Sequence, residues 1–202
     1  MCEPRPGLKL VVLGVSMGGL EALKFLLRHL PANYPLPLVA VQHLNAQAGN
    51  ALAPLLNAVG GLHVKEADDG EIPQPGTLYL APANYHLQVE PGGRLSLSTD
   101  PPVHFARPAV DVLFETAAAA HGSGLVGIVL TGAGSDGSLG LKRIQDQGGL
   151  TLVQSPADAQ CDGMPRQALL ALTPDYQVTL AELPSLLLRL AGGPPSAPRP
   201  PC

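Results

Sequence analysis

The sequence predicts an α/β fold: a doubly wound, mostly parallel sheet with helices on both faces and a small antiparallel hairpin insertion. Three observations predict it. Short, continuously apolar runs alternate with helical patterns, and Gly-rich or polar turns separate them. Apolar residues make up 46% of the 202 residues and charged residues only 14%, which is enough to build one core. The middle of the chain interrupts the alternation with closely spaced short runs.

The alternating segments give the expected strands and helices in order. Buried parallel strands are expected at residues 9–14, 36–42, 125–130 and 150–153. Helical patterns occur at residues 18–29, 48–59, 109–121, 138–147, 165–172 and 180–190. In the first of these, leucines recur at helical spacing and mark a broad buried face. Strands that alternate with helices in this way are typical of a doubly wound sheet.

The segment from residue 73 to residue 98 is expected to form the insertion. It contains short strand patterns at residues 78–81, 86–89 and 95–98, with Pro91-Gly92-Gly93 between the last two. This spacing predicts an antiparallel hairpin at a sheet edge. Residues 1–191 are expected to form one domain, and the Pro-rich residues 192–202 a disordered tail.

Composition limits the cellular compartment and the kinds of partner that are expected. The net charge is −4 and no cluster of Lys and Arg occurs, which argues against nucleic-acid binding. The three cysteines, Cys2, Cys161 and Cys202, form no C-x-x-C pair, so neither a disulfide framework nor a zinc site is expected. The chain shows no signal peptide and no apolar stretch long enough to span a membrane. A cytoplasmic location is therefore expected.

The first strand leads into a candidate nucleophile. The run Gly14-Val15-Ser16-Met17-Gly18 matches G-x-S-x-G between a strand and a helix. Such a turn is expected to hold Ser16 in a strained conformation with its hydroxyl exposed, while the following backbone N–H groups face an oxyanion. The alternative is a phosphate-binding glycine turn, although a dinucleotide fingerprint has Gly where Ser16 stands.

Two other strands supply candidate partners for Ser16. His43 follows the strand at residues 36–42, which is expected to neighbour the Ser16 strand. Asp136 lies in a loop with three glycines after the strand at residues 125–130, and it could instead cap the helix near Ser138. All three residues follow carboxyl ends of parallel strands, where open α/β sheets bind ligands. Their chain order, Ser-His-Asp, differs from that of α/β-hydrolases, so an ordinary lipase-like fold is not expected.

Several further motifs occur in order along the chain. They are Gly14-Val15-Ser16-Met17-Gly18-Gly19, Val41-Gln42-His43, Asp68-Asp69-Gly70, Tyr79-Leu80-Ala81-Pro82, Arg107-Pro108-Ala109-Val110-Asp111, Leu130-Thr131-Gly132-Ala133-Gly134-Ser135-Asp136-Gly137 and Gly163-Met164-Pro165. With these motifs the chain resembles the catalytic domain of the CheB-type protein-glutamate methylesterases of bacterial chemotaxis. The resemblance extends over residues 9–190.

The resemblance implies an activity and a site. Family members hydrolyse glutamate methyl esters on the cytoplasmic helices of chemoreceptors, and many deamidate receptor glutamines. Residues 1–191 would then be a methylesterase-like catalytic domain with Ser16, His43 and Asp136 as its triad, and no metal or organic cofactor would be needed. Backbone N–H groups of Met17 and Ala133 are expected to bind the oxyanion.

Arg107 is a candidate contact for an acidic receptor surface, and a surface ion pair with Asp111 is the alternative.

The chain also departs from the family pattern. Its first strand begins near residue 9, so a stand-alone domain without the family's common receiver domain is expected, and a separate receiver protein is one conceivable regulator. Ala133 stands where the family usually has Met, and Met17 where it usually has a small residue, which alters the pocket. Two alternatives therefore stay open. One is an esterase of the same chemistry with another substrate, and the other is a catalytically silent module that binds sensory partners.

Overall fold

The computed structural model describes residues 7–43 and 51–192 and confirms the predicted α/β class. Seven strands form a parallel sheet in the order β3-β4-β2-β1-β7-β8-β9. They are β1 (Leu10–Val15), β2 (Leu38–Gln42), β3 (His63–Glu66), β4 (Thr77–Leu80), β7 (Leu125–Val129), β8 (Leu150–Gln154) and β9 (Tyr176–Val178). A separate antiparallel hairpin consists of β5 (His86–Val89) and β6 (Leu95–Ser98).

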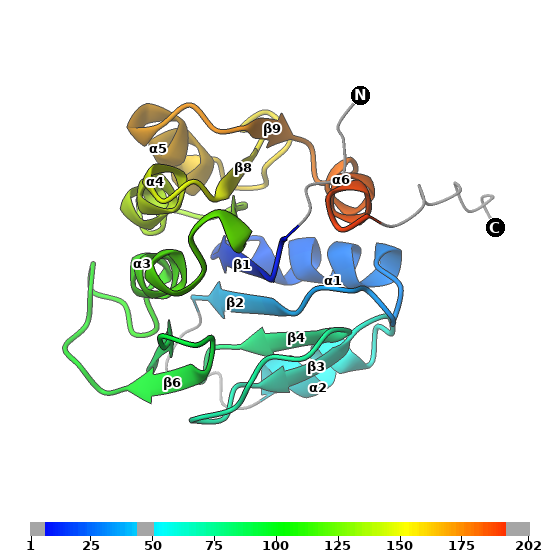
Figure 1. Cartoon of the computed structure of the whole chain (residues 1–202). Coiled ribbons are helices and arrows are strands. Elements are labelled where there is room, and N and C mark those ends of the chain that lie inside the picture. The colour runs from blue at the N-terminus through cyan, green and yellow to red at the C-terminus, as the bar shows by residue number, and fades with distance from the viewer. Residues whose placement is uncertain (1–6, 44–50, 193–202) are drawn as a thin grey trace.

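Within the described residues, six α-helices cover the two faces of the sheet (Figure 1). They are α1 (Gly19–His29), α2 (Leu52–Asn57), α3 (Val110–His121), α4 (Ser138–Asp146), α5 (Gly163–Ala171) and α6 (Leu183–Leu190); the short 3-10 helix η2 (Gly122–Gly124) follows α3. Alternate residues of β1 face opposite layers. Val11 and Leu13 pack with α1, α2 and α6, whereas Leu10 and Val12 pack with α3, α4, α5 and the hairpin.

The strand order places a crossing point at the centre of the sheet. β1 pairs with β2 on one side and with β7 on the other, and the chain winds outward from there in both directions. The arrowheads of β1, β2 and β4 in Figure 1 point to one side, and the loop between β6 and α3 extends on that side. Crevices beyond the carboxyl ends of strands at such a point are the usual ligand sites.

The middle of the chain differs from the sequence prediction in one respect. The run at residues 78–81 is not part of the antiparallel insertion: β4 lies inside the parallel sheet, between β3 and β2. Only β5 and β6 form the predicted hairpin, which packs against α3. The error arose because consecutive short runs usually pair with each other, whereas β4 is connected to β2 through α2 and β3.

Two strands were missed because their patterns are weak. β3, with the sequence HVKE, has two charged residues, and β9 has only three residues; both lie at sheet edges. The helix predicted at residues 48–59 is observed as α2, and residues 48–50 lie outside the described residues. The predicted tail also lies outside them, apart from Gly192.

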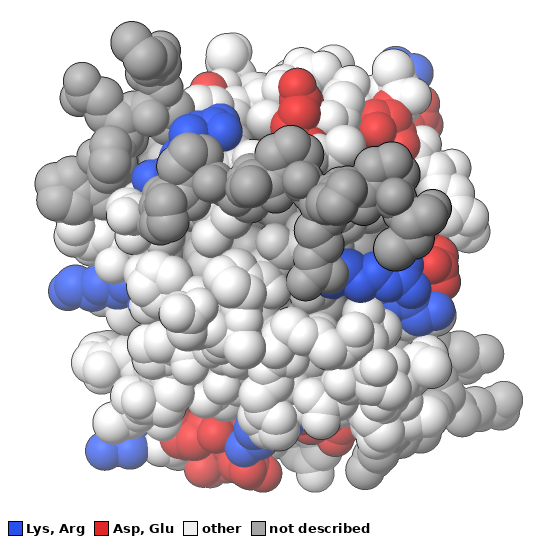
Figure 2. All heavy atoms as spheres, turned by 90° about the vertical axis from the view of Figure 1, so that its right-hand side faces the viewer, with Lys and Arg blue, Asp and Glu red and all other residues white. Residues whose placement is uncertain are grey.

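The face at the amino ends of the strands has no dominant charge. Figure 2 shows acidic and basic side chains next to one another at several places toward the edges of that face, with uncharged residues over its middle. In the part of the chain that the structure describes, no helix is long and apolar enough to span a bilayer.

Candidate active site

Ser16 lies directly after β1, at the crossing point of the sheet. Its backbone N–H donates to Thr131 O at 3.0 Å, and its carbonyl accepts from Gly19 N and from Gln42 Nε2, each at 2.9 Å. The expectation of a strained serine is wrong, since the left-handed conformation belongs to Gly18, with φ of 82°. Glycine adopts this conformation at little cost, so the turn into α1 forms without strain at Ser16.

The loop after β7 lies against Ser16. A Cβ at Gly132 would come within 2.8 Å of Ser16 Cβ and 2.2 Å of Met164 Sδ, so this close approach requires glycine. Thr131 Oγ1 donates to Met17 O at 2.8 Å and fixes the two loops together. The backbone N–H groups of Met17 and Ala133 have no acceptor among the described residues, which leaves them free to bind an anion.

His43 follows β2 and pairs with Asp136. The β1–β2 register pairs Val15 with Gln42, and His43 N donates to Val15 O at 3.1 Å, so the next residues, Ser16 and His43, are neighbours. His43 Nε2 lies 2.8 Å from Asp136 Oδ2. No hydrogen bond joins Ser16 Oγ to His43 in the described part of the chain, and such bonds often form only when substrate binds.

Asp136 joins this pair to the first turn of α3. Its two oxygens accept hydrogen bonds from Val110 N at 2.7 Å and Asp111 N at 2.9 Å. The carboxylate therefore caps α3 rather than α4, whose own N-cap is Gly137. Burial alone would raise the pKa of Asp136. The hydrogen bonds from His43 and from the two backbone N–H groups outweigh burial and lower that pKa below its usual value.

The ionised Asp136 fixes the tautomer of His43. A carboxylate only accepts hydrogen bonds, so His43 Nε2 carries the proton and Nδ1 of the neutral ring has the free lone pair. In the serine-protease triad the roles of the two ring nitrogens are exchanged: Nδ1 carries the proton that faces the carboxylate, and Nε2 is the base.

Arg107 supports the loop between β6 and α3. Its Nη1 donates to Thr99 O at 2.7 Å and Asp100 O at 3.0 Å. It does not pair with Asp111, whose carboxylate lies 3.1 Å from His104 Nε2. His86, buried beneath this loop, lies 3.1 Å from Pro101 O through Nε2 and accepts from Ala109 N through Nδ1.

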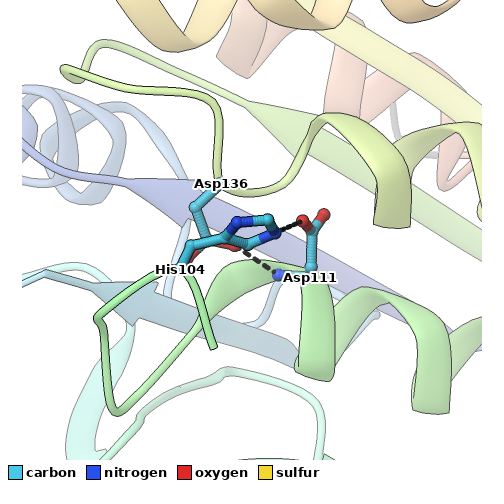
Figure 3. A group of neighbouring side chains, drawn as sticks. All are labelled: His104, Asp111 and Asp136. Atoms are coloured by element: carbon cyan, nitrogen blue, oxygen red, sulfur yellow. Dashed lines mark hydrogen bonds and ion pairs between the residues drawn. The ribbon is translucent and has the colours of Figure 1, made fainter. Parts of the chain in front are cut away.

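Sequence reasoning missed Asp111 and His104 as neighbours of Asp136. Asp111 lies in the motif at residues 107–111, where helical spacing suggests only Arg107 as its partner. His104 follows no strand and gives no sequence signal. Figure 3 shows both residues beside Asp136, with His104 directed at the Asp111 carboxylate.

The same three residues are the candidate metal ligands within the described residues. One ligand atom from each of His104, Asp111 and Asp136 lies within 4.8 Å of the others. Asp136, however, already accepts hydrogen bonds from His43 and two backbone N–H groups. A metal would compete with those bonds, so the donor set does not favour one, and the absence of a metal cofactor stays a prediction.

Comparisons with known proteins agree with this geometry. The sequence model of the CheB methylesterase family matches residues 11–187. The chain is 42% identical to a Leptospira interrogans protein provisionally named protein-glutamate methylesterase/protein-glutamine glutaminase, over 89% of this chain and 93% of that protein. It is 41% identical to the protein-glutamate methylesterase/protein-glutamine glutaminase of Geobacillus kaustophilus, over 93% of this chain but 55% of that longer protein.

A solved structure shows the same fold. The Thermotoga maritima CheB methylesterase catalytic domain matches with a TM-score of 0.86 at 33% identity, over 91% of this chain and 98% of that one. Fold and sequence together define a carboxylic ester hydrolase of the methylesterase class. The chain belongs to the CheB methylesterase family and has the fold of its catalytic domain.

Proposed function

We propose that this chain removes methyl esters from glutamate residues of chemoreceptors, with Ser16 as nucleophile, His43 as base and Asp136 as its orienting carboxylate. The observation that carries the proposal is the 2.8 Å pair of His43 and Asp136, which lies next to Ser16 at the carboxyl ends of β1, β2 and β7. The names of the relatives supply the substrate class.

The proposed reaction is acyl transfer in two steps. His43 Nδ1 takes the hydroxyl proton while Ser16 Oγ attacks the ester carbonyl carbon, and Asp136 stabilises the imidazolium that forms. The C–O bond to methanol breaks as His43 returns the proton to the leaving oxygen. Water, activated in turn by His43, then hydrolyses the acyl-serine and releases glutamate. A glutamine amide would follow the same course, with ammonia as leaving group.

Backbone N–H groups of Met17 and Ala133 are the proposed oxyanion donors. Neither has another acceptor within the described residues, and both lie in loops beside Ser16. A donor of this kind contributes about 2.7–4 kcal/mol to transition-state stabilisation. The Met17 side chain is 60% exposed next to the nucleophile, so it would line the substrate entrance.

The proposed partner is a methylated cytoplasmic helix of a chemoreceptor, and the proposed location is therefore the cytoplasm. Arg107 lies in the loop beside the site, and it would contact acidic receptor residues with guanidinium Nη2, since Nη1 binds Thr99 and Asp100 and Nε is buried.

The test is methanol release from methylated receptor fragments, compared between the wild type and Ser16→Ala. We expect release by the wild type and none above background by the variant, with the thermal unfolding temperature unchanged. A serine-directed phosphonate should label only the wild type. Labelling without methanol release would keep the hydrolase but reject the receptor substrate. Neither labelling nor release would favour a silent binding module.

A further inference from the structure

The loop between β6 and α3 ends in a tight turn with unusual backbone angles. Val103 N donates to Ala106 O at 3.1 Å, and Ala106 N donates to Val103 O at 2.9 Å. The two residues between them, His104 and Phe105, have φ of 50° and 62°. Asn84 is the one other non-glycine with positive φ in the described residues. Backbone strain of this kind often accompanies a functional constraint on the side chains involved.

The turn directs His104 at a buried carboxylate. His104 Nε2 lies 3.1 Å from Asp111 Oδ2, which is an ion-pair distance without hydrogen-bond geometry, and this buried oxygen has no hydrogen-bond partner among the described residues. The Asp111 side chain is only 5% exposed, whereas that of His104 is 43% exposed. The other oxygen, Oδ1, accepts from Gly140 N at 2.6 Å. His104 is thus the one side chain that offers Asp111 a positive charge among the described residues.

Asp111 is coupled to the triad through Asp136. Its backbone N–H donates to Asp136 Oδ1, so two buried carboxylates lie side by side at the start of α3 (Figure 3). Burial raises the pKa of Asp111, the Gly140 N–H lowers it, and the nearby Asp136 charge raises it again. His104 and the exposed Glu115 are the remaining titratable groups acting on Asp111. The titratable partner of His43 is Asp136.

We propose that His104 is a positioning residue for the reaction: it neutralises Asp111, and so limits the negative charge that surrounds the Asp136–His43 pair. This inference rests on the proposed function. An unbalanced negative charge beside Asp136 would favour the protonated form of a base that is held against Asp136. The described residues therefore contain two histidine–carboxylate pairs, His43–Asp136 and His104–Asp111, of which only the first would touch substrate in the proposed reaction.

The test uses the pH dependence of Ser16 labelling by a serine-directed phosphonate, which requires no receptor. Asp111→Asn removes a negative charge and retains an acceptor for Gly140, so the acidic limb of the labelling rate should move to lower pH. His104→Asn removes the cation, and asparagine tolerates positive φ, so the limb should move to higher pH. We expect shifts of about half a pH unit in opposite directions.

The double variant tests whether His104 acts through Asp111. In the Asp111→Asn background, His104→Asn should shift the limb by less than half of its effect in the wild type. Glu115→Gln, on the same helix but exposed, is the matched control and should shift it little. If Ser16 is still labelled but His104→Asn shifts the limb equally in both backgrounds, the inference is wrong. It is also wrong if His104→Asn shifts the limb in neither background. Loss of labelling in the wild type would overturn the proposed function and this inference with it.

Discussion

At the scale of single residues, Asp136 has two roles that are difficult to separate. One oxygen accepts from His43 Nε2 and Val110 N, and the other accepts from Asp111 N. The first contact sets the tautomer of His43, the proposed base, and the others cap a helix. Because only a carboxylate accepts on both oxygens, the charge and the geometry of the site depend on the same group.

Asp136→Asn should therefore impair catalysis much more than folding. The amide nitrogen of the new asparagine would face an N–H donor. His43 could then adopt the tautomer with the proton on Nδ1, so that Nδ1 would no longer be free to act as base. We expect kcat to fall about 10³–10⁴-fold. Stability should fall by about 1 kcal/mol, because half of the cap is lost. Methanol release and urea unfolding measure the two effects. A loss of activity below tenfold would show that Asp136 does not set the tautomer.

The close approach of Ser16, His43 and Asp136 could be predicted because each follows a recognisable strand of a parallel sheet. Ser16, His43 and Asp136 come directly after or shortly after β1, β2 and β7, and the parallel arrangement brings those ends together. The ring nitrogen facing Asp136 could not be predicted, because it depends on the side-chain angles of His43. The contacts of Asp136 with α3 were also missed, because the nearest helix in sequence, α4, offered a simpler cap.

At the scale of elements, the turn at residues 103–106 combines strain with exposure. Phe105 has φ of 62° and its side chain is fully exposed, so it gains no burial in return for its unfavourable backbone. His104 in the same turn has an ion-pair partner, whereas the apolar side chain of Phe105 is left in solvent. The unfavourable backbone of Phe105 is therefore explained by the position of His104, which the same turn holds next to Asp111.

Phe105→Asn should stabilise the protein. Asparagine enters the left-handed region more readily than phenylalanine, and no buried contact is lost. The gain should be about 1 kcal/mol in free energy of unfolding, measured by urea denaturation. Phosphonate labelling of Ser16 serves as control and should be unchanged, because His104 keeps its place. A destabilised variant would mean that Phe105 packs against something in the folded protein.

The same element shows where sequence reasoning ends. The hairpin could be predicted because Pro91-Gly92-Gly93 separates two alternating runs, and both glycines have positive φ. The placement of β4 inside the parallel sheet could not, since its pairing with β2 and β3 is set by packing of the whole sheet. Short strands at sheet edges, such as β9, have too few residues to give a pattern.

At the scale of the whole molecule, the two neighbouring carboxylates act on stability in opposite directions. The pKa of Asp136 is lowered in the folded protein, so its contribution is present above the unfolded value of about 3.8 and is lost as pH falls through the folded pKa. The pKa of Asp111 is raised, mainly by burial. The contribution of Asp111 to the free energy of unfolding is complete below about pH 3.8, and it is lost as pH rises through the pKa of Asp111 in the folded protein.

Replacing each carboxylate by its amide should therefore change the pH profile of stability with opposite signs. Relative to the wild type, Asp136→Asn should be less stable at pH 7, with a difference that shrinks toward pH 3. Asp111→Asn should be more stable at pH 7, because a buried charge is removed while Gly140 keeps its acceptor, and this difference should also vanish toward pH 3. Each unit of pKa change corresponds to about 1.4 kcal/mol. Urea unfolding at pH 3, 5 and 7 measures both. If Asp111→Asn is less stable than the wild type at pH 7, the prediction is wrong. The His104–Asp111 ion pair would then stabilise the fold by more than the burial of the Asp111 charge destabilises it.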